Sequence, residues 1–321
     1  MSIKMTKHLT HLPKGIIVVL VSMCLSLNCS FFSDPEHAPE RTSTPGISLV
    51  LAVSDIVVGE NRLSFGMFNK NGSIVKDSPV EVEFFWDSGS HDETVVKARA
   101  DFMEIQGSTP HRHIDGEIHL HEESVGVHVV EQVEFKESGV WVAKVRTENE
   151  IALDLLPNEF YFQVMEQSST LMVGDLIPHS QNPVITPLVD FRDITTHQPP
   201  IPEFYRLTIA EALTEKKPLV VVFSTPAFCM SRMCGPVTDV VAEVFNTYND
   251  SANFIHIEPW DLQSAREGGP LIWSEVASEW QLPSEPWVFI VDDQGKVFAR
   301  FEGPVNLGEL EIALESLLHL E

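Results

Sequence analysis

The sequence predicts a two-domain protein, an all-β sandwich of immunoglobulin-like outline followed by an α/β domain. Three observations lead to this prediction. Short segments of alternating apolar and polar residues fill 47–165, a proline-bearing stretch covers 166–203, and strand and helix patterns alternate over 204–321. The chain of 321 residues is 43% hydrophobic, which is enough to build two cores.

The N-terminus is typical of an export signal over residues 1–28. Three lysines precede an apolar run at 15–27, which is short for a membrane span. The segment LSLNC resembles a bacterial lipobox, which implies cleavage before Cys29 and lipid attachment to it, with Cys24 as a weaker candidate. An uncleaved anchoring helix is the alternative. We expect an extracytoplasmic, membrane-anchored lipoprotein whose residues 29–46 form a tether.

The net charge of −26 limits the partners. A strongly acidic surface repels nucleic acid and anionic lipid, so neither is expected as a partner. The simplest interpretation of this acidity is solubility. Removal of the signal takes three lysines and no acidic residue, and therefore makes the exported part more acidic.

The expected sandwich, residues 47–165, shows the period of two that half-buried strands require. Apolar residues alternate along several segments, for example at Val80, Val82, Phe84 and Trp86, and at Leu63, Phe65 and Met67. Turn signals such as NKNG and DSGS separate them. Seven or eight such strands without a helical stretch favour an antiparallel sandwich.

The expected linker, 166–203, holds six prolines and shows no sustained periodicity. The pattern then predicts a helix at 207–217, a strand at 218–225, a helix at about 229–248, a strand at 252–260, a helix at 270–281, strands at 286–293 and 296–303, and a helix at 307–318. This order predicts a mixed sheet of four or five strands with helices on both faces.

Cys229 and Cys234 follow the first of these strands. A cysteine at a helix N-terminus meets unpaired N–H groups and the helix dipole, which stabilise its thiolate. Arg232 adds positive charge nearby. An exported compartment allows the pair to form a disulfide. The alternatives are two buried inert thiols and a metal clip, for which copper suits a thiolate pair.

Residues 204–321 resemble the thioredoxin superfamily in the strand–Cys–helix order, in SEPW and in FIVDDQGKVFARFEG. The resemblance implies a thioredoxin-like fold with a cis-proline at Pro286 that faces the cysteines and supports the substrate backbone. It further implies a thiol–disulfide oxidoreductase with Cys229 as nucleophile and Cys234 as resolving cysteine. Its substrate would be a protein or small-molecule disulfide, and no cofactor would be required.

The motif departs from that family, because C-x4-C-GPV stands where thioredoxins have CGPC. Cys234 could instead overlie the first cysteine of CGPC, with Val237 in place of the second. The segment TPAFC…MCG is also similar to TPGC…ACG of Q-type peroxiredoxins, in which the second cysteine resolves an oxidised first one. A helix that began at Cys229 would separate the two Cα atoms by roughly 8–9 Å. That exceeds the disulfide limit of about 7 Å, so we expect oxidation to unwind the first helical turn.

A histidine-rich run at 109–128 is the second candidate site. In EIHLH, strand alternation places His119 and His121 on one face, where both could bind one Zn or Cu ion. His111, His113 or His128 could complete the site. The alternative is a polar insertion with solvated histidines.

Three functions are therefore expected in turn. The first is a surface-anchored thiol–disulfide oxidoreductase, with peroxide reduction as a weaker variant. The second is a copper or zinc carrier that uses the histidines, the cysteines or both. The third is a partner-docking protein whose cysteines have lost turnover.

Overall fold

The structure is a computed structural model that describes residues 48–76, 79–87, 96–112, 118–146 and 159–319. Strands make up 38% of the described residues and helices 22%. Thr44–Glu321 form one compact unit. The expected signal with Cys24 and Cys29, and the expected tether up to residue 46, lie outside the described residues. Among the described residues, no helix combines the length and the apolar character that crossing a membrane requires.

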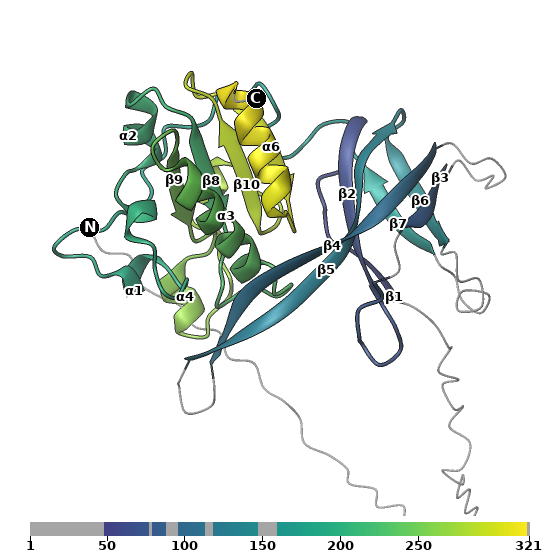
Figure 1. Cartoon of the computed structure of the whole chain (residues 1–321), viewed down its shortest axis with the longest axis horizontal. Coiled ribbons are helices and arrows are strands. Elements are labelled where there is room, and N and C mark those ends of the chain that lie inside the picture. Colours follow the sequence, from purple (N-terminus) through teal and green to yellow (C-terminus); the bar gives the residue numbers. More distant parts are fainter. Residues whose placement is uncertain (1–47, 77–78, 88–95, 113–117, 147–158, 320–321) are drawn as a thin grey trace, which may run out of the picture. The chain divides into compact units, whose positions relative to one another are not determined.

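A seven-stranded antiparallel sheet occupies the first half of the described chain (Figure 1). Its order is β1-β2-β5-β4-β3-β6-β7. The bounds are β1 Ser48–Leu51, β2 Gly59–Phe68, β3 Val80–Trp86, β4 Val96–Arg112, β5 Ile118–Phe135, β6 Gly139–Arg146 and β7 Glu159–Val164. Most of the alternating apolar residues expected to be inside are inside: Leu63, Phe65 and Met67 are fully buried, whereas Trp86 at the end of β3 is exposed. The buried residues of β2 pack with Phe84, Phe135 and Trp141 in one aromatic-rich core.

The fold class predicted from the sequence is wrong. Seven strands form one nearly closed, barrel-like antiparallel sheet instead of two packed sheets, and the remainder is not a clear α/β thioredoxin-like domain. The physical reason lies in β4 and β5, which have 17 and 18 residues and pair along their whole length. Strands of about 5–6 residues are usual. Two such long strands keep the sheet continuous where a sandwich would begin its second sheet.

A second, four-stranded sheet has the order β11-β10-β8-β9. Its strands are β8 Leu219–Phe223, β9 Asn253–Ile257, β10 Trp287–Val291 and β11 Val297–Glu302. The pair β8 and β9 is parallel and the other two pairs are antiparallel. The helices are α1 Phe191–Ile194, η3 Pro202–Tyr205, α2 Ile209–Thr214, α3 Cys234–Tyr248, α4 Leu262–Arg266, α5 Glu275–Glu279 and α6 Leu307–Leu318. The order of strands and helices from residue 207 on agrees with the sequence pattern, with α4 added. The expected linker contains α1 and the start of η3, and the predicted domain boundaries stay a prediction.

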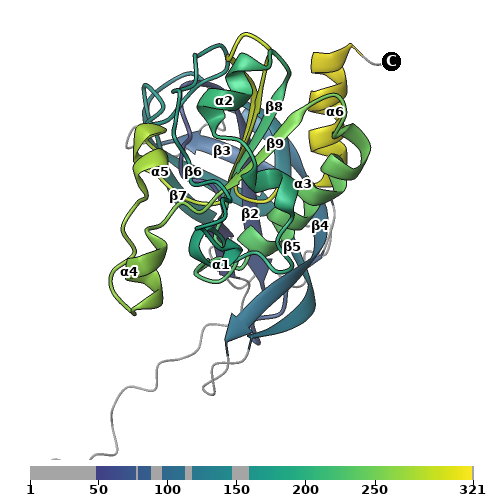
Figure 2. The ribbon, with the colours of Figure 1, turned by 90° about the vertical axis from the view of Figure 1, so that its left-hand side faces the viewer.

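One of the hydrophobic clusters contains residues from both sheets. Met103 and Ile105 of β4 and Val125, Val127 and Val129 of β5 belong to the same buried cluster as Val237, Val241 and Val244 of α3. Figures 1 and 2 show β4 and β5 as a long paired ribbon beside α3, and α6 beside α3. The ribbon thus buries one face against the helix that begins at Cys234.

Buried charged residues form a second connection between the two sheets, called here the Glu302 junction. Both carboxylate oxygens of Glu302, at the end of β11, are hydrogen-bonded: Oε1 accepts from the backbone N–H and the hydroxyl of Ser54, and Oε2 accepts from the N–H of Asp55, at 2.6–2.8 Å. The hydroxyl of Ser284 donates to Oε1 as well. Arg300 and Asp55 form an ion pair of 2.9 Å with side-chain exposures of 14% and 0%. Glu302 therefore joins the segment before β2 to the loop before β10.

Glu302→Ala is expected to destabilise the fold. The change leaves two backbone N–H groups and two hydroxyls without their acceptor, and each unpaired buried donor costs about 1–3 kcal/mol. We expect a loss of roughly 2–4 kcal/mol in the free energy of unfolding, measured by urea denaturation. Glu134→Gln, at an exposed position of β5, serves as control. An unchanged midpoint for Glu302→Ala would show that the junction does not depend on this carboxylate.

Candidate functional site

Helix α3 begins at Cys234, and not at Cys229 as the sequence pattern predicted. Pro236 is its third residue, where a helix tolerates proline because the first-turn N–H groups have no partner within the helix. Arg232 adopts the left-handed conformation, with φ of 61°, and so interrupts a continuous helix from Cys229. Cys229 consequently lies in the loop that precedes the helix.

The loop returns the Cys229 sulfur to the start of α3. The backbone N–H of Cys234 donates to the Cys229 Sγ at 3.4 Å, and the Ser231 hydroxyl lies 3.3 Å from the same sulfur. Both cysteines are free thiols; Cys229 is half-buried and Cys234 is fully buried. The first N–H of the helix, which has no acceptor within the helix, thus points at the sulfur.

These contacts separate the acidities of the two thiols. The pKa of Cys229 is lowered to about 6, first by the hydrogen bond from the Cys234 side chain and further by Ser231, against the opposing effect of burial. The pKa of Cys234 is raised, chiefly by burial and also because its thiol donates to Cys229. At neutral pH the accessible sulfur is therefore a thiolate and the buried one a thiol.

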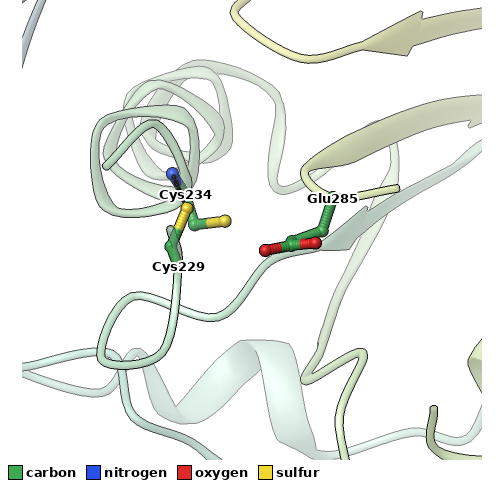
Figure 3. Close-up of side chains that lie close together, drawn as sticks. All are labelled: Cys229, Cys234 and Glu285. Carbon is green, nitrogen blue, oxygen red and sulfur yellow. Dashed lines mark hydrogen bonds between the residues drawn. The ribbon is translucent and has the colours of Figure 1, made fainter. Parts of the chain in front are cut away.

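Glu285 is the third member of the site and was missed by sequence reasoning. Its carboxylate and the two sulfurs all lie within 4.8 Å of one another, and Figure 3 shows the carboxylate pointing toward the cysteines. Burial, followed by the negative charge of Cys229, raises the pKa of Glu285 to about 7. Its signal in the sequence was its position directly before Pro286.

Two further residues expected at the cysteine pair, Pro286 and Arg232, lie in different surroundings. The Glu285–Pro286 peptide bond is cis, as the resemblance implied, and Pro286 is buried at the start of β10. Arg232 is exposed in the turn, and the hydrogen bond from the Cys234 side chain is the largest cause of the lowered pKa of Cys229. The catalytic roles of both residues stay predictions.

The expected unwinding of the helix on oxidation loses its premise. Because Cys229 lies outside α3, its sulfur can move toward Cys234 while the helix stays intact. A disulfide bond of about 2.0 Å requires an approach of up to roughly 3 Å from the present separation. The loop that carries Cys229 can supply this movement. The hydrogen bond from the Cys234 N–H ends at the sulfur that moves, so this bond ties no other atom of the loop to α3.

A buried polar layer lies behind the cysteines. Thr196, from the expected linker, donates its N–H and its hydroxyl to Glu258, whose pKa burial raises to about 7. The Thr196 hydroxyl also accepts from the N–H of Ala227, at 3.1 Å in the cysteine loop. His256 is a core histidine: its Nε2 donates to the Ser224 carbonyl, and burial lowers its pKa to about 3. The hydrogen bond from Ala227 to Thr196 thus attaches the start of the cysteine loop to this polar layer.

The histidine run gives a mixed result. His111 pairs with His119 across β4 and β5, so two of the candidate ligands occupy opposite positions in the ladder. His113 lies outside the described residues. His128 does not belong with them: it is buried between Phe65 and Phe102, and it lies seven strand residues from His121, roughly 23 Å away. Metal binding by the others stays a prediction.

The comparisons with known proteins give no relative. No protein-family model matches the chain, and no curated protein or solved structure matches it either. Within the described residues, Cys229, Cys234 and Glu285 form a group that could hold a metal ion.

Alkylation of Cys229 is expected to follow a low pKa. With a pKa of about 6, the rate should rise about tenfold from pH 5 to about pH 7.5 and then level off, because only the thiolate reacts. The measurement is the rate of iodoacetamide modification of the reduced chain, with each cysteine identified by peptide mass.

In Ser231→Ala the alkylation rate of Cys229 should level off at a higher pH, because the change removes one hydrogen-bond donor to the sulfur. If the alkylation rate of the parent chain still climbed about fivefold per pH unit near pH 8, the assignment would be contradicted, since that is the behaviour of an unshifted thiol.

Proposed function

We propose that this chain is an extracytoplasmic thiol–disulfide oxidoreductase. The observation that supports it is the arrangement of the two sulfurs: a half-buried Cys229 sulfur accepts the first N–H of a helix, and a second, fully buried sulfur lies within 4.8 Å. The pKa of Cys229 is lowered and that of Cys234 is raised, so the two cysteines suit different steps of the reaction.

In the first step the Cys229 thiolate attacks one sulfur of a substrate disulfide. The substrate S–S bond breaks, a mixed disulfide with Cys229 forms, and the other substrate sulfur leaves as a thiolate that takes up a proton. In the second step Cys234 loses its proton and attacks the Cys229 sulfur. The second substrate thiol is released and a Cys229–Cys234 disulfide remains. The substrate gains two electrons and the pair loses two, and a dithiol reductant must then restore the pair.

Glu285 fits the role of proton acceptor in the second step. The buried Cys234 thiol cannot lose its proton readily by itself, because burial disfavours its charged form. A carboxylate with a pKa of about 7 within 4.8 Å is ionised for about half of the molecules at neutral pH and can accept the proton. Pro286, next to it, fits the role of a platform for the substrate backbone.

The proposal includes the cellular location that the N-terminus suggests. An export signal with lipid on Cys29 would hold the chain at a membrane, in a compartment that permits disulfides. The expected partner is a protein or small-molecule disulfide. The acidity of the chain continues to argue against nucleic acid as a partner.

Metal binding is a second candidate, supported by the three ligand atoms of Cys229, Cys234 and Glu285. Two thiolates and a carboxylate suit Zn²⁺, and the thiolate pair alone suits Cu⁺. Equilibrium dialysis of the reduced chain against each ion distinguishes this function. Stoichiometric binding that Cys229→Ser and Glu285→Gln both abolish would favour it.

Substitutions of the two cysteines should have different effects in a disulfide-reduction assay with insulin and dithiothreitol. Cys229→Ser removes the nucleophile and should reduce turnover by at least about 100-fold. Cys234→Ser keeps the backbone N–H donor and removes the resolving thiol, so the mixed disulfide between Cys229 and substrate should accumulate in non-reducing gels.

The control is the double change Cys24→Ser and Cys29→Ser, which should leave turnover unchanged. Equal turnover in Cys229→Ser and the parent chain would overturn the proposed function.

A further inference from the structure

A largely apolar pocket of about 490 Å³ lies next to the cysteine pair. Ser231, which contacts the Cys229 sulfur at 3.3 Å, and Glu285, which lies within 4.8 Å of both sulfurs, form part of its lining. Groups that flank a substrate disulfide at Cys229 can therefore reach this pocket.

The pocket is built by the two sheets together. Val50–Ser54, from β1 and the segment after it, form one wall, with Phe68 of β2 beside them. Met233, Pro286 and Pro304 complete it from the side of the cysteines. Val50 leaves 52% of its side-chain area exposed, although it is apolar. The seven-stranded sheet thus supplies the surface that a substrate next to Cys229 would touch.

The charges of the lining restrict what can bind. Glu302 is occupied by donors from Ser54, Asp55 and Ser284, which leaves Glu285 as the acidic group nearest the sulfurs. None of the described residues that line the pocket is basic. The chain as a whole carries a charge of −26. Negatively charged disulfides are disfavoured here, and uncharged apolar groups are favoured.

The size of the pocket favours a peptide over a small disulfide. A volume of about 490 Å³ lies within the usual range for ligand sites and is much larger than the methylene group of one cysteine requires. Its longest wall consists of five consecutive residues, 50–54, so the lining is extended along a chain direction.

We propose that this pocket binds an extended peptide segment of the substrate, with uncharged apolar side chains next to its disulfide-bonded cysteine. The proposal rests on the proposed function, because it names the substrate class of the same cysteine pair. It adds that β1 and β2 determine specificity through Val50 and Phe68.

Single-turnover reactions of the reduced full-length chain test this proposal without an external reductant. The probes are 2-pyridyl disulfides of acetyl-Leu-Cys-Leu-amide, acetyl-Ser-Cys-Ser-amide, acetyl-Asp-Cys-Asp-amide and propanethiol. In each, Cys229 attacks the probe sulfur and expels 2-thiopyridone, whose absorbance reports the rate, and Cys234 then releases the probe thiol.

The Leu peptide should react roughly tenfold or more faster than the Ser peptide, and the Asp peptide slowest. Val50→Ser and Phe68→Ala should each remove most of the preference for Leu, so that the Leu and Ser peptides react at similar rates. A urea midpoint near that of the parent chain shows that these variants are folded. Val140→Ser, at a similarly exposed valine of β6 outside the pocket, should behave like the parent chain.

The failures are distinguishable. Equal rates with the Leu and Ser peptides, or a preference that survives both substitutions, overturn the pocket proposal and leave the oxidoreductase in place. A propanethiol probe that matches the Leu peptide overturns the peptide as occupant. No reaction at Cys229 with any probe overturns the proposed function and this proposal together.

Discussion

The contact of Cys234 with the Cys229 sulfur, made by the Cys234 side chain and by its backbone N–H, is the interaction on which the site depends. The backbone hydrogen bond exists because α3 begins at Cys234 and leaves its first N–H without a helical acceptor. Through this contact the helix start stabilises negative charge on a sulfur that lies outside the helix. The same arrangement holds Cys234 in the core, where burial keeps its proton in place. One local feature thus sets both acidities.

The surroundings of this contact come from distant parts of the chain. The Thr196 hydroxyl accepts a hydrogen bond from Ala227 and so holds the cysteine loop. Glu285, in the loop before β10, lies near both sulfurs. Glu302 connects that loop to the segment before β2. The segment that connects β1 and β2 is therefore linked to the environment of the cysteines, which is the observation behind the proposed role of the seven-stranded sheet in substrate recognition.

The sequence allowed the strands and their buried faces to be predicted, because alternation at Leu63, Phe65 and Met67 reports which side faces a core. It did not reveal which strands pair, since the same alternation suits a sandwich and a barrel-like sheet. The ladder of β4 and β5 runs through the histidine-rich segment, whose polarity concealed it. The cysteine pair was predictable from its spacing after a strand. Glu285 was not, because its place beside the sulfurs results from tertiary packing.

The most direct test of this account is the equilibrium oxidation of the full-length chain in dithiothreitol buffers of graded redox potential, with the disulfides mapped by mass spectrometry. The account predicts a single two-electron transition in which Cys229 and Cys234 become linked to each other and the content of helix stays constant. Cys229 and Cys234 that remain reduced across the whole series would contradict it, as would a Cys229 that pairs with Cys24 or Cys29 while Cys234 stays a thiol.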